Sequence, residues 1–229
     1  MTTHISDQID AAPQAPRPKR GRPVGLSAAS RELLLDAAED LFGRKGIDGV
    51  SLREIGEAAG QRNNNVVRYH FQTKSNLLAI LLAERIAEVE RARQALVDAH
   101  APLSGQSPEK LLHMLWAPLL EVGMRHNQHR FIRLLLACQI EQQTKLHPLV
   151  AAPEGHPASG SIIAALCKCF PQVSEDQCLY RLSVLAMMFW AAVSAHDQRI
   201  AAGDTSWPSH FTIDELIRLA VAALTAPEG

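Results

Sequence analysis

The sequence predicts an all-α protein, with a small N-terminal domain of three helices followed by a larger helical body. Three observations support this fold class. Apolar residues recur at helical spacing from about residue 30 onward, and no segment shows the alternation typical of a strand. Aromatic residues make up only 5% of the 229 residues, which disfavours an all-β sandwich.

The charge is unevenly distributed along the chain. The net charge is −1, but residues 17–74 contain 11 basic and 7 acidic residues, which leaves −5 for the rest. A basic N-terminal third predicts contact with a polyanion. No apolar run approaches the ~18 residues that cross a bilayer, and no apolar leader is present. We expect a cytoplasmic protein with its four cysteines reduced.

The first helix is predicted after an aperiodic arm. Residues 1–26 contain many Pro, Ala and Asp residues, and we expect them to be disordered. "SRELLLDAAEDLFGRKG" then forms a helix that ends at Lys45 and Gly46. Its predicted buried face consists of Leu33, Leu34, Ala37, Ala38, Leu41 and Phe42.

Two short helices follow. In "SLREIGEAAG", Ser51 and Glu54 have the spacing of a capping box, and Gly60 ends the helix. "QRNNNVVRYHF" predicts another short helix, capped by Asn63 or Asn64. Two short helices joined by a glycine turn and packed against a longer one form a helix-turn-helix, which we place within residues 27–75.

The body is predicted as further helices. They span 73–100 after a Thr73 cap, 108–127 after a Ser107 cap with Pro118 inside, 129–144, 159–170, 174–202 and 212–225, with a loop at 146–160. Thr212 and Glu215 have the spacing of a second capping box.

"LLLDAAEDLFGRKGIDGVSLREIGEAAG" followed by "YHFQTKSNLL" resembles the TetR family of bacterial transcriptional regulators. The resemblance covers roughly residues 31–80, about a fifth of the chain. Two departures leave the transfer of base contacts by position open. The segment from Gln61 to Phe71 is one residue longer than is common in the family, and Arg68 occupies the usual tyrosine position.

The resemblance implies a homodimeric, non-enzymatic repressor of the bacterial cytosol that binds a palindromic operator. Residues 76–229 would then bind a small lipophilic effector and form the dimer, through pairing of 174–202 with 212–225 across a two-fold axis. A constitutive or protein-regulated DNA-binding protein without such a switch remains an alternative, and a helical enzyme that binds a metal or a small molecule is a less favoured one.

The candidate DNA contacts combine base-reading and phosphate-binding groups. Gln and Asn side chains can bind adenine in pairs and Arg can bind guanine, while the flanking groups contact phosphate. "KRGRP" resembles a minor-groove AT-hook core. The candidates are Arg20, Gly21, Arg22, Ser51, Arg53, Gln61, Arg62, Asn63, Asn64, Asn65, Arg68, Tyr69, His70 and Lys74. Asn63–Asn65 acting only as a solvated cap remains an alternative, and His70 and Phe71 also suit structural roles.

Candidate effector contacts are large apolar residues with polar neighbours on the middle helices, a pattern typical of a ligand cavity. They are His113, Trp116, Phe131, Leu135, Gln139, Met187 and Trp190. Ordinary core packing explains each one equally well.

The sequence gives weaker evidence for a metal site or a catalytic site than for DNA binding. His126 and His129 have an i,i+3 spacing, but partners at diagnostic zinc spacing are missing. The sequence has no Gly-x-Ser-x-Gly elbow, P-loop or dinucleotide-binding glycine pattern. We therefore expect no metal, no cofactor and no catalytic residues.

Overall fold

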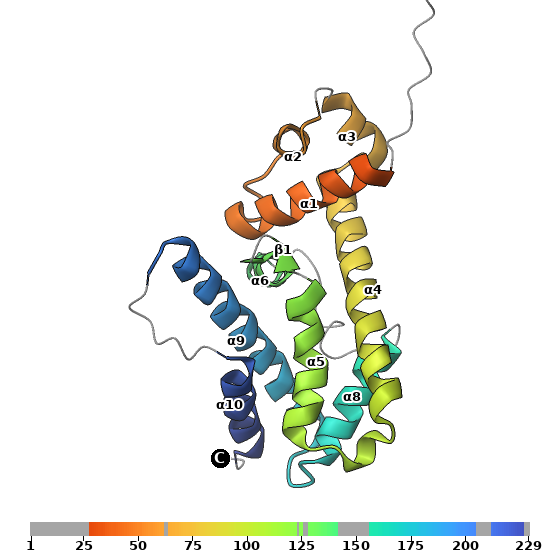
Figure 1. Ribbon diagram of the computed structural model, residues 1–229, viewed down its shortest axis with the longest axis vertical. Coiled ribbons are helices and arrows are strands. Elements are labelled where there is room, and N and C mark those ends of the chain that lie inside the picture. The colour runs from red at the N-terminus through yellow and green to blue at the C-terminus, as the bar shows by residue number, and fades with distance from the viewer. Residues whose placement is uncertain are drawn as a thin grey trace, which may run out of the picture.

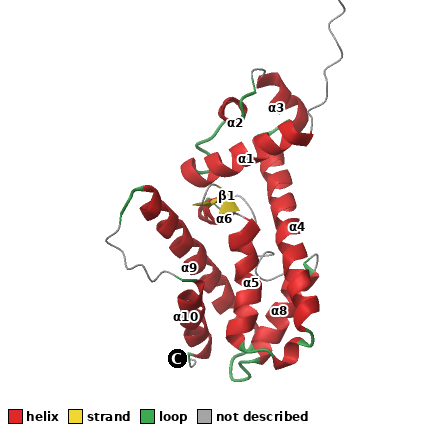
Figure 2. Cartoon of the chain, in the orientation of Figure 1, coloured by secondary structure: helices red, strands yellow, loops and turns green. Residues whose placement is uncertain are grey.

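The computed structural model describes residues 28–61, 64–122, 124–125, 128–141, 156–204 and 212–226. Its elements are α1 (Ala28–Lys45), α2 (Leu52–Ala58), α3 (Asn64–Phe71), α4 (Lys74–His100), η1 (Leu103–Gly105), α5 (Pro108–Val122), β1 (Met124–Arg125), β2 (Gln128–His129), α6 (Arg130–Ile140), α8 (Pro157–Lys168), α9 (Glu175–Ala201) and α10 (Ile213–Thr225). The fold is helical, as the sequence predicts (Figure 2).

A small hairpin of β1 and β2 interrupts the helices. Met124 pairs with His129 and Arg125 pairs with Gln128 in an antiparallel arrangement. The sequence predicted helix up to about residue 127 and no strand, so the hairpin corrects that expectation. Strands of two residues are too short to show an alternating pattern.

Helices α1, α2 and α3 form the N-terminal domain at one end of the molecule (Figure 1). Their apolar faces meet in a core that includes Leu34, Leu35, Phe42, Ile55, Val67 and Phe71. The prediction for α1 was wrong at one position, because Leu33 is 54% exposed and Leu35 is fully buried. In a run of three leucines, periodicity alone does not decide which two face inward.

Most predicted helix ends are confirmed by their hydrogen bonds. Ser51 and Glu54 form both halves of the capping box. The hydroxyl of Thr73 accepts the Asn76 N–H at 3.1 Å and starts α4. Gly46 has a φ of +78°, the left-handed conformation that glycine adopts most easily after a helix.

The second predicted capping box is seen only in half. The Thr212 hydroxyl accepts the Glu215 N–H at 3.2 Å, as expected. The Glu215 carboxylate contacts Arg218 on its own helix. Two adjacent acidic residues in the first turn of α10 still favour a helix start there, because of the helix dipole.

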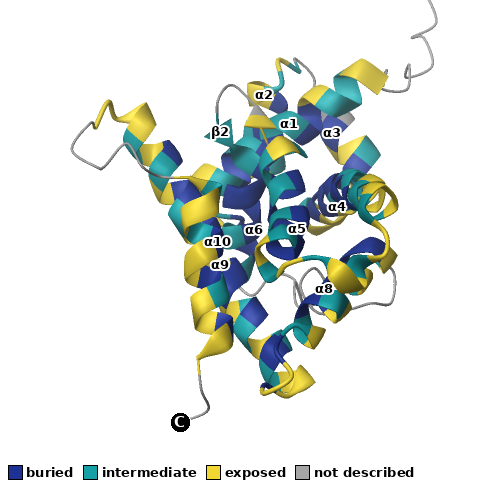
Figure 3. Ribbon diagram, turned by 60° about the horizontal axis from the view of Figure 1, so that its bottom comes forward, coloured by how far each residue is buried: buried dark blue, intermediate teal, exposed yellow. Residues whose placement is uncertain are grey.

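Helix α4 runs from the N-terminal domain into the body and joins the two parts (Figure 1). In the body, α5 and α8 pack against α4, while α6 packs beneath α1 and against α9. Helix α10 packs against α5 and α9. Figure 3 shows buried residues gathered where these helices face one another and exposed residues along the outer sides of α9 and α10.

Helix α9 is more apolar than a single core-facing stripe requires. Among the described residues it is the one helix long and apolar enough to cross a membrane, with a mean hydropathy of 1.5 over 18 residues. This finding corrects the expectation that no segment approaches that limit. In the fold, 44% of that window is buried, with Leu182, Phe189 and Val193 in the core.

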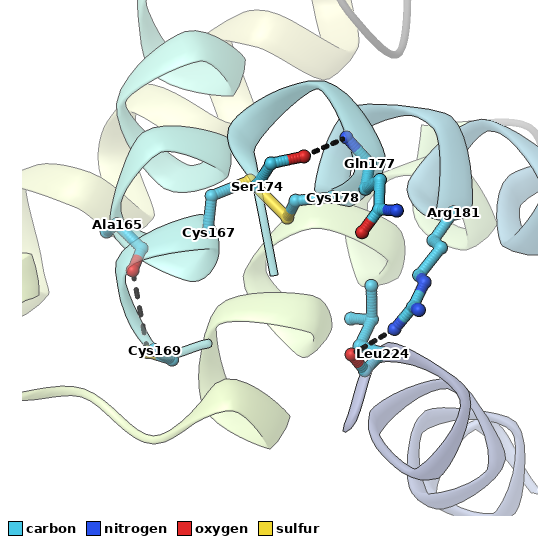
Figure 4. Close-up of a disulfide and its surroundings, with 8 residues drawn as sticks. All are labelled: Ala165, Cys167, Cys169, Ser174, Gln177, Cys178, Arg181 and Leu224. Atoms are coloured by element: carbon cyan, nitrogen blue, oxygen red, sulfur yellow. Dashed lines mark hydrogen bonds between the residues drawn. A yellow bond between two sulfur atoms is a disulfide. The ribbon is translucent and has the colours of Figure 1, made fainter. Parts of the chain in front are cut away.

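A disulfide joins the end of α8 to the start of α9 (Figure 4). Cys167 and Cys178 are bonded, with 5.8 Å between their Cα atoms. Cys138 and Cys169 are not part of a disulfide among the described residues. The expectation that all four cysteines are reduced is therefore corrected, because the turn after α8 brings two of them together in a way that spacing alone does not reveal.

Candidate nucleic-acid interface and apolar cavity

The turn between α2 and α3 is built on Gly60. Its φ of +71° lies in the left-handed region, and the Gln61 N–H donates to the Gly56 carbonyl at 2.9 Å. Helix α3 then buries Val67 and Phe71 and leaves Arg68 and Tyr69 exposed. Helix α3 lies at the end of the molecule (Figure 1), and its exposed residues include a cation and a phenol.

Several predicted DNA contacts lie outside the described residues. This holds for Arg20, Gly21, Arg22, Arg62 and Asn63. Asn64 and Asn65 lie in the first turn of α3, but their side chains are outside the description. His70 is half-buried, with its ring edge-on to Tyr69 at 5.1 Å between centroids.

At the start of α2, the predicted DNA contacts Ser51 and Arg53 form hydrogen bonds and an ion pair within the N-terminal domain. The Ser51 N–H donates to the Glu54 carboxylate at 2.8 Å and the Ser51 hydroxyl lies 2.9 Å from it. The backbone bond from Ser51, then its hydroxyl and Lys45, lower the pKa of Glu54 to about 2. Arg53 is exposed and pairs with Glu57 at 2.8 Å, so it can exchange this partner for a phosphate.

Lys74 holds the loop that precedes α2. Its Nζ donates to the carbonyls of Ile47 at 2.7 Å and Asp48 at 3.3 Å. From the other side, the Glu141 carboxylate accepts the N–H groups of Ile47 at 2.8 Å and Asp48 at 3.0 Å. The loop is thus attached to the first turn of α4 and to the end of α6, a link that the sequence did not predict.

A second link connects α1 to α4 through Arg85, which is 1% exposed. Its guanidinium donates to Glu39 at 2.7 Å and to Asp36 at 2.8 Å, and both carboxylates belong to α1. It also donates to Glu32 at 3.0 Å and to Glu88 at 3.1 Å. Burial alone lowers the pKa of Arg85, but the bonds to Glu39 and Glu32 outweigh burial and raise it.

Helix α6 contacts both the N-terminal domain and α9. Arg130 and Arg133 lie 3.5 and 3.6 Å from the Asp40 carboxylate of α1. At the other side, the His129 N–H donates to the buried Asp197 carboxylate of α9 at 2.6 Å, and the His129 ring lies 2.9 Å from it. Direct contacts therefore connect α9 to α1 by way of His129 and α6.

His129 is accordingly part of a structural link, not of a helical His pair, and His126 lies outside the described residues. Among the described residues, no group of three His, Cys, Asp or Glu side chains is arranged to hold a metal ion.

An apolar cavity lies in the body between α4, α5, α6 and α9, and its volume is about 20 Å³. Four of the predicted effector contacts line it: Trp116, Phe131, Leu135 and Trp190. Trp116 also stacks on Phe189 of α9, with 4.7 Å between ring centroids. The volume is close to that of one ordered water, so a larger molecule must move the walls apart.

The structure places the other three predicted effector contacts elsewhere. His113 lines a shallow surface depression between α5 and α10, with Asp214 and Arg218. Gln139 is half-buried outside the cavity lining, and Met187 is 41% exposed on α9. Helical spacing did not distinguish these faces, since helices of the body have neighbours on several sides.

Arg93 is a cavity residue that the sequence did not predict. It is 3% exposed on α4 and donates twice to the Leu115 carbonyl, from Nε at 3.0 Å and from Nη2 at 2.6 Å. Its Nη1 donates to Glu90 at 3.0 Å and to Ser159 at 2.7 Å. Burial lowers the pKa of Arg93, while the bond to Glu90 opposes that effect.

Comparison with known proteins supports the arrangement of the N-terminal domain. Residues 34–81 match a family model described as "Bacterial regulatory proteins, tetR family". No curated protein matches the sequence.

Solved structures resemble most of the chain. One, described as "Molecular basis for control of antibiotic production by a bacterial hormones", is 16% identical, covers 86% of this chain and 98% of its own, and has a TM-score of 0.55. A transcriptional regulator from Rhodococcus sp. Rha1 is 16% identical, with 85% of this chain and 95% of that chain covered and a TM-score of 0.51. At such identities the similarity concerns the fold.

Proposed function

We propose that this chain, whose residues 34–81 match the family model of tetR-type bacterial regulatory proteins, is a TetR-family regulator: a cytoplasmic transcriptional repressor released from its operator by a small lipophilic effector. It binds DNA as a homodimer. The observation that carries the proposal is the placement of α3, whose exposed side lies at the end of the molecule within the segment that matches the family model (Figure 1).

DNA binding is supported by the chemistry around α3. Arg68 and Tyr69 are exposed there, and both side chains can bind phosphate. Residues 17–74 carry a net charge of +4, which favours association with a polyanion. In this proposal α3 enters the major groove, and the polar residues from Gln61 to Asn65 read bases from its N-terminal end.

Dimerisation is supported by an exposed apolar strip on α9 and α10. The members of this strip are Tyr180, Val184, Met187, Met188 and Leu219, with exposed fractions between 40% and 69%. The four on α9 recur at intervals of three and four residues, which places them on one side of the helix. A second copy of the chain covers this strip in the proposal, and the resulting two-fold symmetry requires a palindromic operator.

The effector switch is supported by the helices that surround the cavity. Helix α4 carries Arg85, and Glu141 follows directly after helix α6; both residues bind the N-terminal domain. A molecule that widens the cavity must displace at least one of these helices or α9. It shifts the protein toward a form with low DNA affinity only as far as it binds that form more tightly.

The DNA-binding part of the proposal is tested by selecting genomic fragments that the protein retains, and then measuring affinity for the selected operator by fluorescence anisotropy. Arg68→Ala should weaken binding similarly for all sequences and lower the salt slope by about 1, because one phosphate contact is lost. Arg218→Ala, at an exposed arginine of α10, is the matched control and should leave both unchanged.

Failure to enrich any palindromic fragment, or equal behaviour of the two arginine variants, would contradict the proposal. Operator binding that no effector weakens would instead support a constitutive or protein-regulated regulator.

A further inference from the structure

The indole N–H of Trp190 has an unusual environment. Trp190 is 3% exposed and lines the cavity, and its Nε1 is buried with no acceptor among the described residues. A buried donor without an acceptor costs about 1–3 kcal/mol. Such a group is uncommon in a folded protein, and here it belongs to a residue that lines the space in which the effector is proposed to bind.

The rest of the lining does not supply an acceptor. Apart from Arg93, Trp116 and Trp190, the lining side chains are hydrocarbon. Arginine and tryptophan side chains only donate hydrogen bonds. Four of the five N–H groups of Arg93 donate to Leu115, Glu90 and Ser159, so its fifth is also available as a donor. The polar side chains of the lining therefore offer hydrogen-bond donors and no acceptor.

The charge of Arg93 is already balanced. Glu90 is its ion-pair partner, and although burial raises the pKa of Glu90, its bonds to Ser159 and Arg93 outweigh that effect and lower it. Both groups are thus charged near neutral pH and together contribute no net charge. An anionic ligand would bring a buried charge that has no counter-charge left, which is costly.

Building on the proposed function, we propose that the effector is a neutral, largely apolar molecule that carries a hydrogen-bond acceptor, such as the carbonyl of a ketone or ester, and that Trp190 Nε1–H donates to this acceptor. The hydrocarbon part of the molecule packs between Trp116 and Phe131. In the narrow cavity the indole N–H has no acceptor among the described residues, and the carbonyl oxygen supplies one when the walls separate.

The test compares two probes of nearly equal shape, acetophenone and ethylbenzene, with the full-length protein and with Trp190→Phe. Isothermal titration calorimetry gives the four affinities. Trp190→Phe should weaken acetophenone about 5- to 10-fold, the value of one net hydrogen bond, and should change ethylbenzene less than 2-fold. Comparing both probes cancels the packing change that the substitution causes.

Trp116→Phe is the matched control, because it also removes a cavity indole. It should weaken both probes by a similar factor. Benzoate, the anionic analogue, should bind more weakly than acetophenone to the wild-type protein.

A second measurement does not depend on any variant folding well. The protein has three tryptophans, and their indole protons are resolved by ¹⁵N-edited NMR. Acetophenone should move one of the indole protons downfield, and ethylbenzene should leave that proton near its free position. The Trp190→Phe spectrum, where that variant folds, identifies the signal.

Several outcomes would overturn the inference: equal sensitivity of both probes to Trp190→Phe, tighter binding of benzoate, or no binding of acetophenone. Operator release, measured by anisotropy in the same samples, separates this inference from the proposed function. Binding of acetophenone through Trp190 without release would contradict the switch and leave the inference intact. Release by ethylbenzene as effectively as by acetophenone would support the switch and contradict the inference.

Discussion

Arg85 shows how strongly one side chain can connect the two parts of this molecule. It lies on α4, is almost fully buried, and donates to three carboxylates of α1. Glu39 is buried with it, at 1% exposure. In the sequence, Arg85 and Glu39 look like ordinary surface charges of two amphipathic helices, and nothing local indicates that the two helices cross there.

We predict that Arg85→Ala lowers the free energy of unfolding by about 3–5 kcal/mol, because the buried Glu39 carboxylate loses the counter-charge that Arg85 supplies. Urea unfolding monitored by circular dichroism measures the change. Arg91→Ala, at an exposed position of the same helix, should cost less than about 0.5 kcal/mol. Replacing both buried partners, Arg85→Met with Glu39→Leu, should recover much of the loss. A loss below about 1 kcal/mol for Arg85→Ala would show that Glu39 is solvated.

At the scale of elements, the ends of α1 and α2 show what helix signals do and do not predict. Gly46 and Gly60 both follow a helix with positive φ, +78° and +71°. Their surroundings differ. A Cβ on Gly46 would lie 2.4 Å from the Glu141 carboxylate, whereas a Cβ on Gly60 would meet no atom within 4 Å. The sequence predicted both glycine ends, but the approach of α6 to only one of them is tertiary.

We predict that Gly60→Ala costs about 1–2 kcal/mol, the strain of a left-handed alanine, and that Gly46→Ala costs more. The additional loss arises because Glu141 must move and give up its bonds to the loop before α2. Chemical denaturation of the two variants gives the comparison, with Gly60→Ala as the control for strain alone. Equal losses at both glycines would mean that Glu141 is not held in place.

At the scale of the whole molecule, the exposed strip on α9 and α10 is the feature that a single chain leaves unexplained. Helix α9 buries Leu182, Phe189 and Val193 on one side and exposes Tyr180 and Met188 on the other. Exposed apolar residues that gather on one side of a helix favour an interaction site. The sequence indicates that α9 needs cover on more than one side, but not which neighbour supplies it.

We predict that the protein has twice the chain mass of 25.1 kDa in solution, and that Tyr180→Glu with Met188→Glu converts it to a monomer. Two charges buried at the dimer interface without partners should disrupt it. Light scattering after size exclusion measures the mass. Ile140→Glu, at a position 69% exposed on α6, is the control for adding a charge to an exposed apolar site and should remain dimeric. A wild-type mass of 25.1 kDa would contradict the prediction.

By itself, the sequence determined the helical class, the extent of most helices, the Ser51–Glu54 and Thr73 caps, the glycine ends of α1 and α2, and the family of the N-terminal domain. These properties depend on residues only a few positions apart, so periodicity and capping patterns in the sequence are enough to predict them. It also identified four residues of the cavity, since large apolar side chains on the middle helices are frequent in such a lining.

Only the tertiary structure decided how the helices meet. It buried Arg85 and Arg93, paired Cys167 with Cys178, brought Glu141 to the loop before α2, and placed Met187 outside the cavity and Trp190 inside it. Each of these outcomes depends on contacts between distant segments, and a helix with several neighbours does not encode in its own spacing which face meets which partner.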